Sequence, residues 1–326
     1  MGIGSRSDKG SGNLPGPTPL AGQVRRIAMG ERRRVGRVAV PMLALLPVAA
    51  IVVFFYIGAT LWTAGISLTD SRLLPTGKFI GLTQYQRLFA TPVWQTSLVN
   101  LVILAVLVIG GCLVLGTLLA IALDRAVRFE NSFRTIFLYP YALSFVVTGL
   151  VWQWLMNPGL GLQATAQQLG WTWFVFDWPQ HRETAIYAVV LAGLWQGAGF
   201  VMVLMLAGLR GIDQDIWRAT RIEGIPVTRT YWSIVLPQLS PTIATALILL
   251  AMGVIRTYDL VVAMTNGGPG TSTSVPAKFI IDNLFGRQNL GLATAGATVM
   301  LVTVLAVVVP IAYAQNIRAA RRRNAL

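Results

Sequence analysis

Cysteine, histidine and lysine are nearly absent from this chain of 326 residues. The lone cysteine, Cys112, lies inside an apolar run, so an intrachain disulfide and a cysteine metal cluster are excluded. The lone histidine, His181, has no second histidine to form a metal-binding pair, and we expect it on a loop surface. None of the three lysines, Lys9, Lys78 and Lys278, stands in a G-K-[ST] context, so the chain has no Walker A loop for ATP.

Charged residues are also few: they make up 12% of the chain, against 55% hydrophobic residues, and the mean hydropathy is +0.64. This composition is too apolar for a soluble domain of this length and predicts an integral membrane protein. A net charge of +14 is also found in nucleic-acid-binding proteins, but here the basic residues cluster beside apolar runs instead of forming one stripe. We therefore expect no nucleic-acid partner.

Six apolar runs are each long enough to cross about 30 Å of hydrocarbon as a helix. A cleaved signal peptide is an alternative for the first run, but that run is longer than a usual signal core and lacks a clear cleavage site. The Gly-, Ser-, Pro- and Arg-rich residues 1–37 are predicted to be disordered, and residues 317–326 form a basic tail. We expect six transmembrane helices within residues 38–316, near 38–68, 96–123, 134–156, 184–209, 238–264 and 290–316.

Lysine and arginine are distributed unevenly between the connecting segments. Nineteen lie in the N-terminal segment, the 124–134 loop, the 210–237 loop and the C-terminal tail, whereas six lie in the loops on the opposite side. Because positively charged segments stay in the cytoplasm, this bias predicts that both termini and the 210–237 loop are cytoplasmic.

Residues 212–237 are a polar interruption between the fourth and fifth runs, with helix signals of their own. Asp213 is a candidate N-cap, Asp215 lies in the first turn, and Gly224 stops the helix. We predict one short helix over residues 214–223. Two interpretations follow: a capped surface helix that only connects two spans, or a helix that lies against another protein surface.

The spacing within this interruption resembles the EAA loop of ABC importer permeases. That pattern, E-A-A, three residues, Gly, nine residues, I-x-L-P, is met by Arg218-Ala219-Thr220, Gly224 and the Ile-Val-Leu-Pro run at 234–237. Residues 79–85 (F-I-G-L-T-Q-Y) are similar to the F-x-G-L-x-N-Y segment of maltose-transporter-type sugar permeases, and residues 265–269 (T-N-G-G-P) to their T-x-G-G-P segment. The three matches occur in order, so the chain is identified as a member of this carbohydrate-importer family.

The resemblance implies an all-α integral membrane protein with the six-transmembrane-helix fold of ABC importer permeases and a short cytoplasmic coupling helix. It implies a non-catalytic subunit that forms half of the translocation pathway of an ATP-driven sugar importer in a bacterial cell (inner) membrane. The expected partners are a second permease subunit, an ATPase dimer, an extracellular or periplasmic sugar-binding protein and the lipid bilayer. ATP and magnesium are expected on the ATPase, and no cofactor on this chain. The residues expected to couple to the ATPase are Asp213, Asp215, Trp217, Arg218, Ala219, Thr220, Arg221, Glu223 and Gly224.

Two positions of the loop depart from the family pattern: Arg218 stands where glutamate is common, and Thr220 where alanine is common. A glutamate at the first position could pair with a basic residue of the ATPase, whereas Arg218 would repel that residue. Either the partner surface differs, or Arg218 points away from it.

A sugar path needs polar groups that match hydroxyls, together with flat aromatic faces. By spacing, Gly197, Phe200, Val254 and Thr257 fall where maltose-type permeases present sugar-contacting residues. Ordinary helix packing is the alternative for each candidate. The full set of candidates is Trp152, Gln153, Asn157, Trp195, Gln196, Gly197, Phe200, Val254, Arg256, Thr257, Tyr258 and Asp259.

Arg256 and Asp259 lie three residues apart in the fifth run, which places them on one face of a continuous helix. A charge that faces lipid costs about 2.5–3.5 kcal/mol, so both should face the bundle interior or its outer mouth. There they either lock the fifth span to its neighbours or line the transport path.

Two other functions compete with that of an importer subunit. A stand-alone secondary transporter would use Arg256 and Asp259 for ion coupling, but such proteins usually show repeat symmetry and broken helices. An intramembrane enzyme is disfavoured, because the sequence has no histidine pair, no metal-ligand set and no activated nucleophile near His181.

Overall fold

The structure, a computed structural model, describes residues 45–124 and 128–323, so the segment 1–37 lies outside the described residues. The chain divides into two compact units, Met1–Trp62 and Thr63–Leu326. A helix of 22 residues, Leu45–Ile66, begins in the first unit. It contains the π-helical segment η1 (Val53–Ile57) and ends as α2 (Gly58–Ile66).

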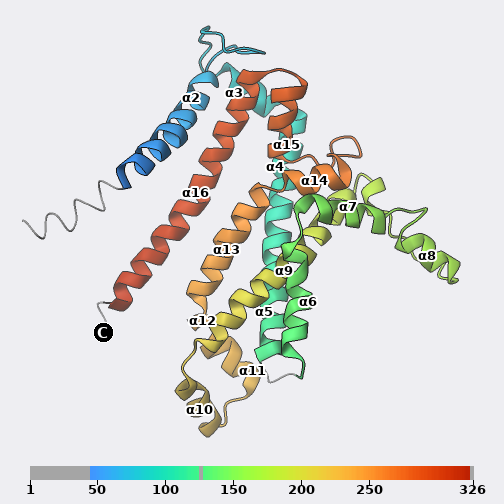
Figure 1. Cartoon of the computed structure of the whole chain (residues 1–326), viewed down its shortest axis with the longest axis vertical. Coiled ribbons are helices and arrows are strands. Elements are labelled where there is room, and N and C mark those ends of the chain that lie inside the picture. The colour runs from blue at the N-terminus through green and yellow to red at the C-terminus, as the bar shows by residue number, and fades with distance from the viewer. Residues whose placement is uncertain (1–44, 125–127, 324–326) are drawn as a thin grey trace, which may run out of the picture. The chain divides into compact units, whose positions relative to one another are not determined.

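The second unit is built from helices joined by turns and short loops (Figure 1). Within the described residues the extended backbone forms one isolated antiparallel bridge, between Thr69 and Phe79. The elements in chain order are α3 (Thr83–Ala90), α4 (Pro92–Leu104), η2 (Ala105–Ile109), α5 (Gly110–Asp124), α6 (Glu130–Ala142), α7 (Phe145–Leu155), α8 (Leu162–Gln168), η3 (Trp178–Gln180), α9 (Ala185–Arg210), α10 (Gln214–Ile222), α11 (Val227–Thr230), η4 (Tyr231–Val235), α12 (Leu236–Gln238), α13 (Ser240–Ile255), α14 (Tyr258–Thr265), α15 (Pro276–Ile281), η5 (Asp282–Gly286) and α16 (Leu290–Arg323).

Helix α9 is the centre of the second unit, because it contacts α4, α5, α6, α7, α13 and α14. Its buried residues occur on more than one side of the helix, as expected for a helix enclosed by others. Glycines permit the closest of these approaches: a Cβ on Gly199 would lie 1.8 Å from the carbonyl oxygen of Phe137 in α6, and a Cβ on Gly116 of α5 would lie 2.6 Å from Val201. The α5–α9 and α6–α9 contacts therefore depend on residues without a side chain.

A second, smaller cluster joins α3, α4, α15 and α16. Trp94 and Leu88 are fully buried, and the rings of Trp94 and Phe279 lie 5.2 Å apart at 59°. Asn100 of α4 ties the loop after α14 to this cluster, since its amide donates to the carbonyls of Ser272 and Ser274, each at 2.8 Å. This loop contains the T-N-G-G-P segment.

Three helices within the described residues are long and apolar enough to cross a membrane: Leu45–Ile66, Pro92–Asp124 and Ala185–Arg210. Two bent pairs meet the same requirement when each is taken as one span. Helix α16 is continuous through Arg323, with a described apolar portion of Leu290–Ala306. The total of six crossings stays a prediction.

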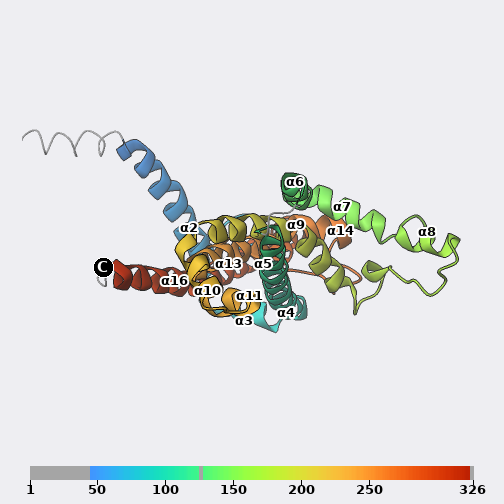
Figure 2. The ribbon, with the colours of Figure 1, turned by 90° about the horizontal axis from the view of Figure 1, so that it is seen from below.

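The expected span at 134–156 is in fact two helices, α6 and α7, which meet at 101°. Pro140 and Ser144 explain the break. Proline lacks the N–H of a regular helix turn, and the Ser144 hydroxyl caps α7 by accepting from the Val147 N–H at 3.2 Å. In Figure 2, α6 is seen nearly end-on while α7 and α8 lead away from it.

The expected span at 238–264 is also interrupted. Helix α13 ends at Ile255 and α14 begins at Tyr258, and the N–H groups of Arg256 and Thr257 bond three residues back, to Gly253 and Val254. The Thr257 hydroxyl also donates to the Val254 carbonyl. These tight bonds close the last turn of α13 and let α14 start in a new direction.

Candidate functional site

A cavity of about 560 Å³ lies where α6, α9, α13 and α14 meet, next to both helix breaks. The turn at Leu143 and Ser144 forms part of its wall, and so do Arg256 and Thr257 at the second break. Its volume is in the range of small-molecule sites. Of the predicted path residues, the cavity is lined by Gln196, Gly197, Phe200, Val254, Arg256, Thr257 and Asp259.

The polar side chains of this cavity are only partly satisfied by the chain itself. Gln196 is 4% exposed, and its Nε2 donates to the Leu143 carbonyl at 2.8 Å. Its Oε1 is buried without a hydrogen-bond partner in the described part of the chain. A buried amide oxygen without a partner is costly, so Gln196 is a polar group that the described part of the chain satisfies only at one end.

Arg256 and Asp259 both line the cavity, but they do not form an ion pair with each other. The expectation that they share the face of one helix is wrong, because α13 ends before Arg256 and Asp259 lies in the first turn of α14. Both side chains are exposed. The cavity thus contains one positive and one negative group that are not neutralised by each other.

Aromatic faces also line the cavity. The rings of Tyr141 in α6 and Phe200 in α9 are stacked, with centroids 4.5 Å apart and planes at 12°. The sequence interpretation missed Tyr141 and Ser144. Their signals were the Tyr-Pro-Tyr triplet at 139–141 and a serine directly before an apolar run, which is an N-cap pattern.

Five predicted path residues lie outside the cavity lining. Trp152 and Trp195 contact each other edge to face, with centroids 5.9 Å apart. The Asn157 side chain holds a turn, since its Oδ1 accepts from the N–H groups of Gly159 and Leu160 at 2.9 and 3.1 Å. Gln153 is exposed and Tyr258 is half-buried, and neither lines the cavity.

Gly197 has a packing role in addition to its place in the wall. A Cβ at this position would lie 2.8 Å from the Cys112 sulfur of α5. Cys112 itself is fully buried, as expected for a packing residue. Within the described residues no group of three or more histidine, cysteine, aspartate or glutamate side chains is placed to hold a metal ion.

The short helix predicted at 214–223 is confirmed as α10, Gln214–Ile222. Asp213 caps it: its Oδ1 accepts from the Asp215 N–H at 2.9 Å. Gly224 follows the helix with φ +66°, in the left-handed region that glycine adopts without a steric cost. A helix of nine residues would not persist alone in water, so these end contacts and its packing fix it in place.

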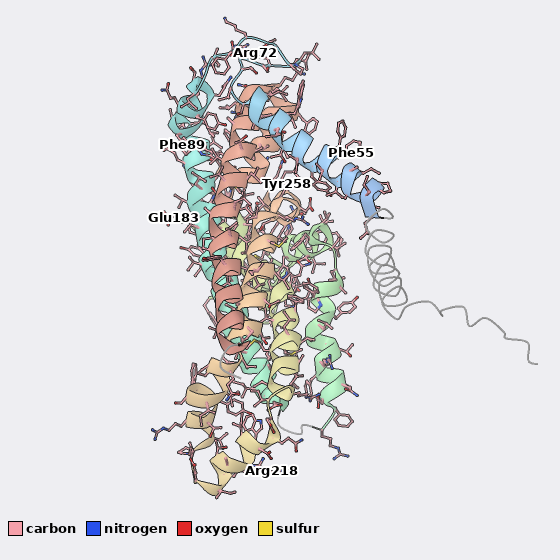
Figure 3. The ribbon with its side chains drawn as sticks, turned by 90° about the vertical axis from the view of Figure 1, so that its left-hand side faces the viewer. Phe55, Arg72, Phe89, Glu183, Arg218 and Tyr258 are labelled. Carbon is pink, nitrogen blue, oxygen red and sulfur yellow. The ribbon has the colours of Figure 1, made fainter. Side chains whose placement is uncertain are left out.

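One face of α10 packs against the rest of the second unit, and the other faces outward. Trp217 contacts Tyr231 with ring centroids 5.4 Å apart, and Thr220 is buried. On the outward face, Arg218 pairs with Asp215 at 3.1 Å, and Ile222 is 86% exposed. Figure 3 shows Arg218 at the end of the second unit remote from Arg72.

Of the remaining loop residues, Ala219, Arg221 and Glu223 are exposed. A groove of about 860 Å³ runs between α10, the 225–231 segment and the ends of α5 and α9. Its wall includes Arg218 and Arg221. The second unit therefore combines a partly open cavity with an exposed, capped helix, and α9 connects the two.

Comparison with known proteins assigns this combination to a family. Residues 112–323 match the family of binding-protein-dependent transport system inner membrane components. A probable ABC transporter permease protein of Pyrococcus horikoshii is 37% identical over 274 residues, which is 83% of this chain and 94% of the relative. The xylose/arabinose import permease protein XacH of Haloferax volcanii is 33% identical over 79% of this chain and 82% of its own length.

Solved structures agree on the fold. A bacterial ABC transporter involved in the import of the acidic polysaccharide alginate contains a chain that superposes with a TM-score of 0.74 at 18% identity, over 87% of this chain and 97% of that chain. These matches confirm the resemblance first seen in the EAA-like loop, and the helical membrane fold. This chain belongs to the family of binding-protein-dependent transport system inner membrane components, the permease components of ABC importers.

Proposed function

We propose that this chain is a non-catalytic permease subunit that forms half of the translocation pathway of an ATP-driven sugar importer. The observation that carries the proposal is the continuity of α9. It lines the cavity through Gln196 and Phe200, runs unbroken to Arg210, and is followed within three residues by the exposed helix α10. A rigid helix of this kind transmits a displacement at α10 to the cavity wall.

The chemistry of the cavity supports a carbohydrate as the cargo. The stacked rings of Tyr141 and Phe200 offer flat apolar faces, and the amide of Gln196, whose Oε1 has no partner in the described part of the chain, adds a polar group to the wall. Arg256 adds a hydrogen-bond donor and Asp259 an acceptor, and the two side chains do not pair with each other. Relatives are named as permeases for xylose and arabinose, for trehalose and maltose, and for sn-glycerol-3-phosphate.

The remaining parts of the transporter are proposed from the family. A second permease subunit supplies the other half of the path, and an ATPase dimer binds ATP and magnesium and contacts α10. An external sugar-binding protein delivers the cargo, and a related transporter has been seen in complex with a periplasmic protein bound to an alginate pentasaccharide. The bias of lysine and arginine supports a cytoplasmic location for both termini and α10.

Sugar uptake by proteoliposomes that contain the complete transporter tests the coupling role of α10. Replacing Ala219 by proline breaks the middle of α10, at a cost of about 3 kcal/mol in helix stability, while the exposed position leaves the membrane helices intact. We expect Ala219→Pro to abolish ATP-dependent uptake and Ala219→Ser to retain it. Normal uptake by the proline variant would refute coupling through α10.

The same vesicles also test the whole proposal. Uptake should need ATP inside the vesicle, the ATPase and the sugar-binding protein. Uptake by this chain alone, driven by an ion gradient without ATP, would instead establish a secondary transporter.

A further inference from the structure

The groove beside α10 is lined by three arginines: Arg210 from the end of α9, and Arg218 and Arg221 from α10. It contains one acidic side chain, Asp124 at the end of α5. The charged residues of the lining therefore have a net charge of +2, and one of them, Arg218, stands where the family pattern has a glutamate.

The arginines differ in how far their charge is already compensated. Arg210 pairs with Glu130 at 2.5 Å, and this glutamate lies outside the groove lining. Arg218 pairs with Asp215, but both side chains are more than two-thirds exposed. Water therefore screens this ion pair, and breaking it so that Arg218 can pair with another group costs little free energy. Arg221 has no ion pair among residues 45–124 and 128–323.

The acidic residue of the groove is also engaged. The Tyr231 hydroxyl donates to Asp124 at 3.2 Å, and Tyr231 in turn packs against Trp217. Asp124 is thus held by the body of the unit, while Arg221 and Arg218 lie on the exposed helix. Asp213, Asp215 and Glu223 of the same segment are exposed but lie outside the groove lining, so the charge that the lining itself offers is positive.

The apolar part of the outward face lies next to this charge. Ile222 is 86% exposed and Val227 is 55% exposed, and Arg218 and Ile222 share one face of α10 because they are four residues apart. Exposed apolar residues beside a charged rim are typical of a protein contact. A small anion would need the arginines but not Ile222.

We propose that the groove beside α10 receives an acidic side chain of the ATPase subunit, with Arg221 and Arg218 as its ion-pair partners and Ile222 as the neighbouring apolar anchor. This inference rests on the proposed function, because it names the chemistry of the partner surface. It also accounts for Arg218: the charge at this position is reversed relative to the family pattern, and the partner carries a carboxylate to match.

Binding of the cognate ATPase subunit to the permease pair in lipid nanodiscs tests the inference. The Kd is measured at about 0.01 M and about 1 M salt, where the Debye length falls from about 30 Å to about 3 Å. We expect Arg221→Gln to raise the Kd about three- to tenfold at low salt and to reduce its dependence on salt. Arg221→Glu should raise the Kd further, and Arg221→Lys should restore most of the affinity.

Arg287→Gln is the matched control, because Arg287 is an exposed arginine remote in sequence from the groove and outside its lining. Ile222→Ala should weaken binding at both salt concentrations, since its contribution is apolar. Inorganic phosphate, titrated at constant ionic strength, distinguishes a protein partner from a free anion.

The outcomes separate the two proposals. If the ATPase does not bind the unmodified permease pair, the proposed function fails. If it binds, and Ile222→Ala weakens binding while Arg221→Gln behaves like Arg287→Gln, the acidic partner is refuted and the importer function stands. Phosphate binding that depends on Arg221, with an unchanged Kd for the ATPase, would show an anion site and would also overturn the inference.

Discussion

Replacing Gly199 by alanine should destabilise the contact between α6 and α9, because no other described glycine has so little room for an added methyl group. The added Cβ would lie 1.8 Å from the Phe137 carbonyl oxygen and 2.6 Å from the Phe137 carbonyl carbon. These are backbone atoms of a helix, so they cannot rotate away as a side chain would. Helix α6 would have to retreat by more than about 1 Å in a close-packed interior.

The size of the effect follows from that displacement. Inserting one methyl group into a packed core lowers the free energy of unfolding by about 1–3 kcal/mol. We expect a value near 3 kcal/mol here, because backbone atoms have to move. In a helical domain of this size, 3 kcal/mol corresponds to a fall in Tm of about 6–12 °C. Because Tyr141 lies one turn after Phe137, and Phe200 follows Gly199 directly, the retreat also separates the stacked rings in the cavity.

Thermal unfolding in detergent measures the change in Tm, and Gly110→Ala provides the control. Gly110 is an exposed glycine at the start of α5, and a Cβ there meets nothing within 4 Å. Alanine should be neutral or stabilise α5 by up to about 1 kcal/mol through helix propensity. A Tm of the Gly199→Ala variant within 1 °C of that of the Gly110→Ala variant would refute the close contact between α6 and α9.

Three further predictions concern the loop after α14, the cavity, and the packing between α5 and α9. Replacing Asn100 by leucine leaves the carbonyls of Ser272 and Ser274 without their donor, at about 1–3 kcal/mol each, so amide hydrogen exchange in residues 266–275 should accelerate while that of α9 does not. Replacing Tyr141 by alanine removes a stacking face worth about 0.5–1.5 kcal/mol, so the KM for sugar uptake should rise about three- to tenfold, and Tyr141→Phe should remain near the original value. Cys112 is fully exposed to reagent only after unfolding, so maleimide should label it in dodecyl sulfate but not in the folded protein.

The sequence was most informative where local signals and chain position agreed. Helix α10 was predicted within one residue, because an aspartate cap and a glycine stop bracket a short polar segment. These signals act over a single turn, so they do not need knowledge of distant contacts. The packed face of α10 was not predictable in the same way, since it depends on Tyr231, which approaches Trp217 only after the chain has turned back.

The helix breaks were missed for a related reason. Residues 134–156 and 238–264 are apolar throughout most of their length, and hydropathy measures whether a segment suits lipid, not whether it is straight. Pro140 and Ser144 were visible in the sequence, but each is tolerated inside a continuous membrane helix when neighbours satisfy the backbone. Which outcome applies is decided by tertiary contacts.

Gln196 shows how those contacts connect the breaks to the candidate transport path. A broken helix in a membrane leaves backbone groups without intrahelical partners, and these are tolerated only where protein or a cavity satisfies them. The Gln196 Nε2 donates a hydrogen bond to the Leu143 carbonyl at the first break, which explains why a polar residue is buried in the middle of α9. Its Oε1 is buried and has no hydrogen-bond partner in the described part of the chain, and Gln196 lines the same cavity as Arg256 and Thr257 at the second break. Burial of this polar residue in α9 therefore has a structural reason, because one end of its amide stabilises the bend that forms part of the cavity wall.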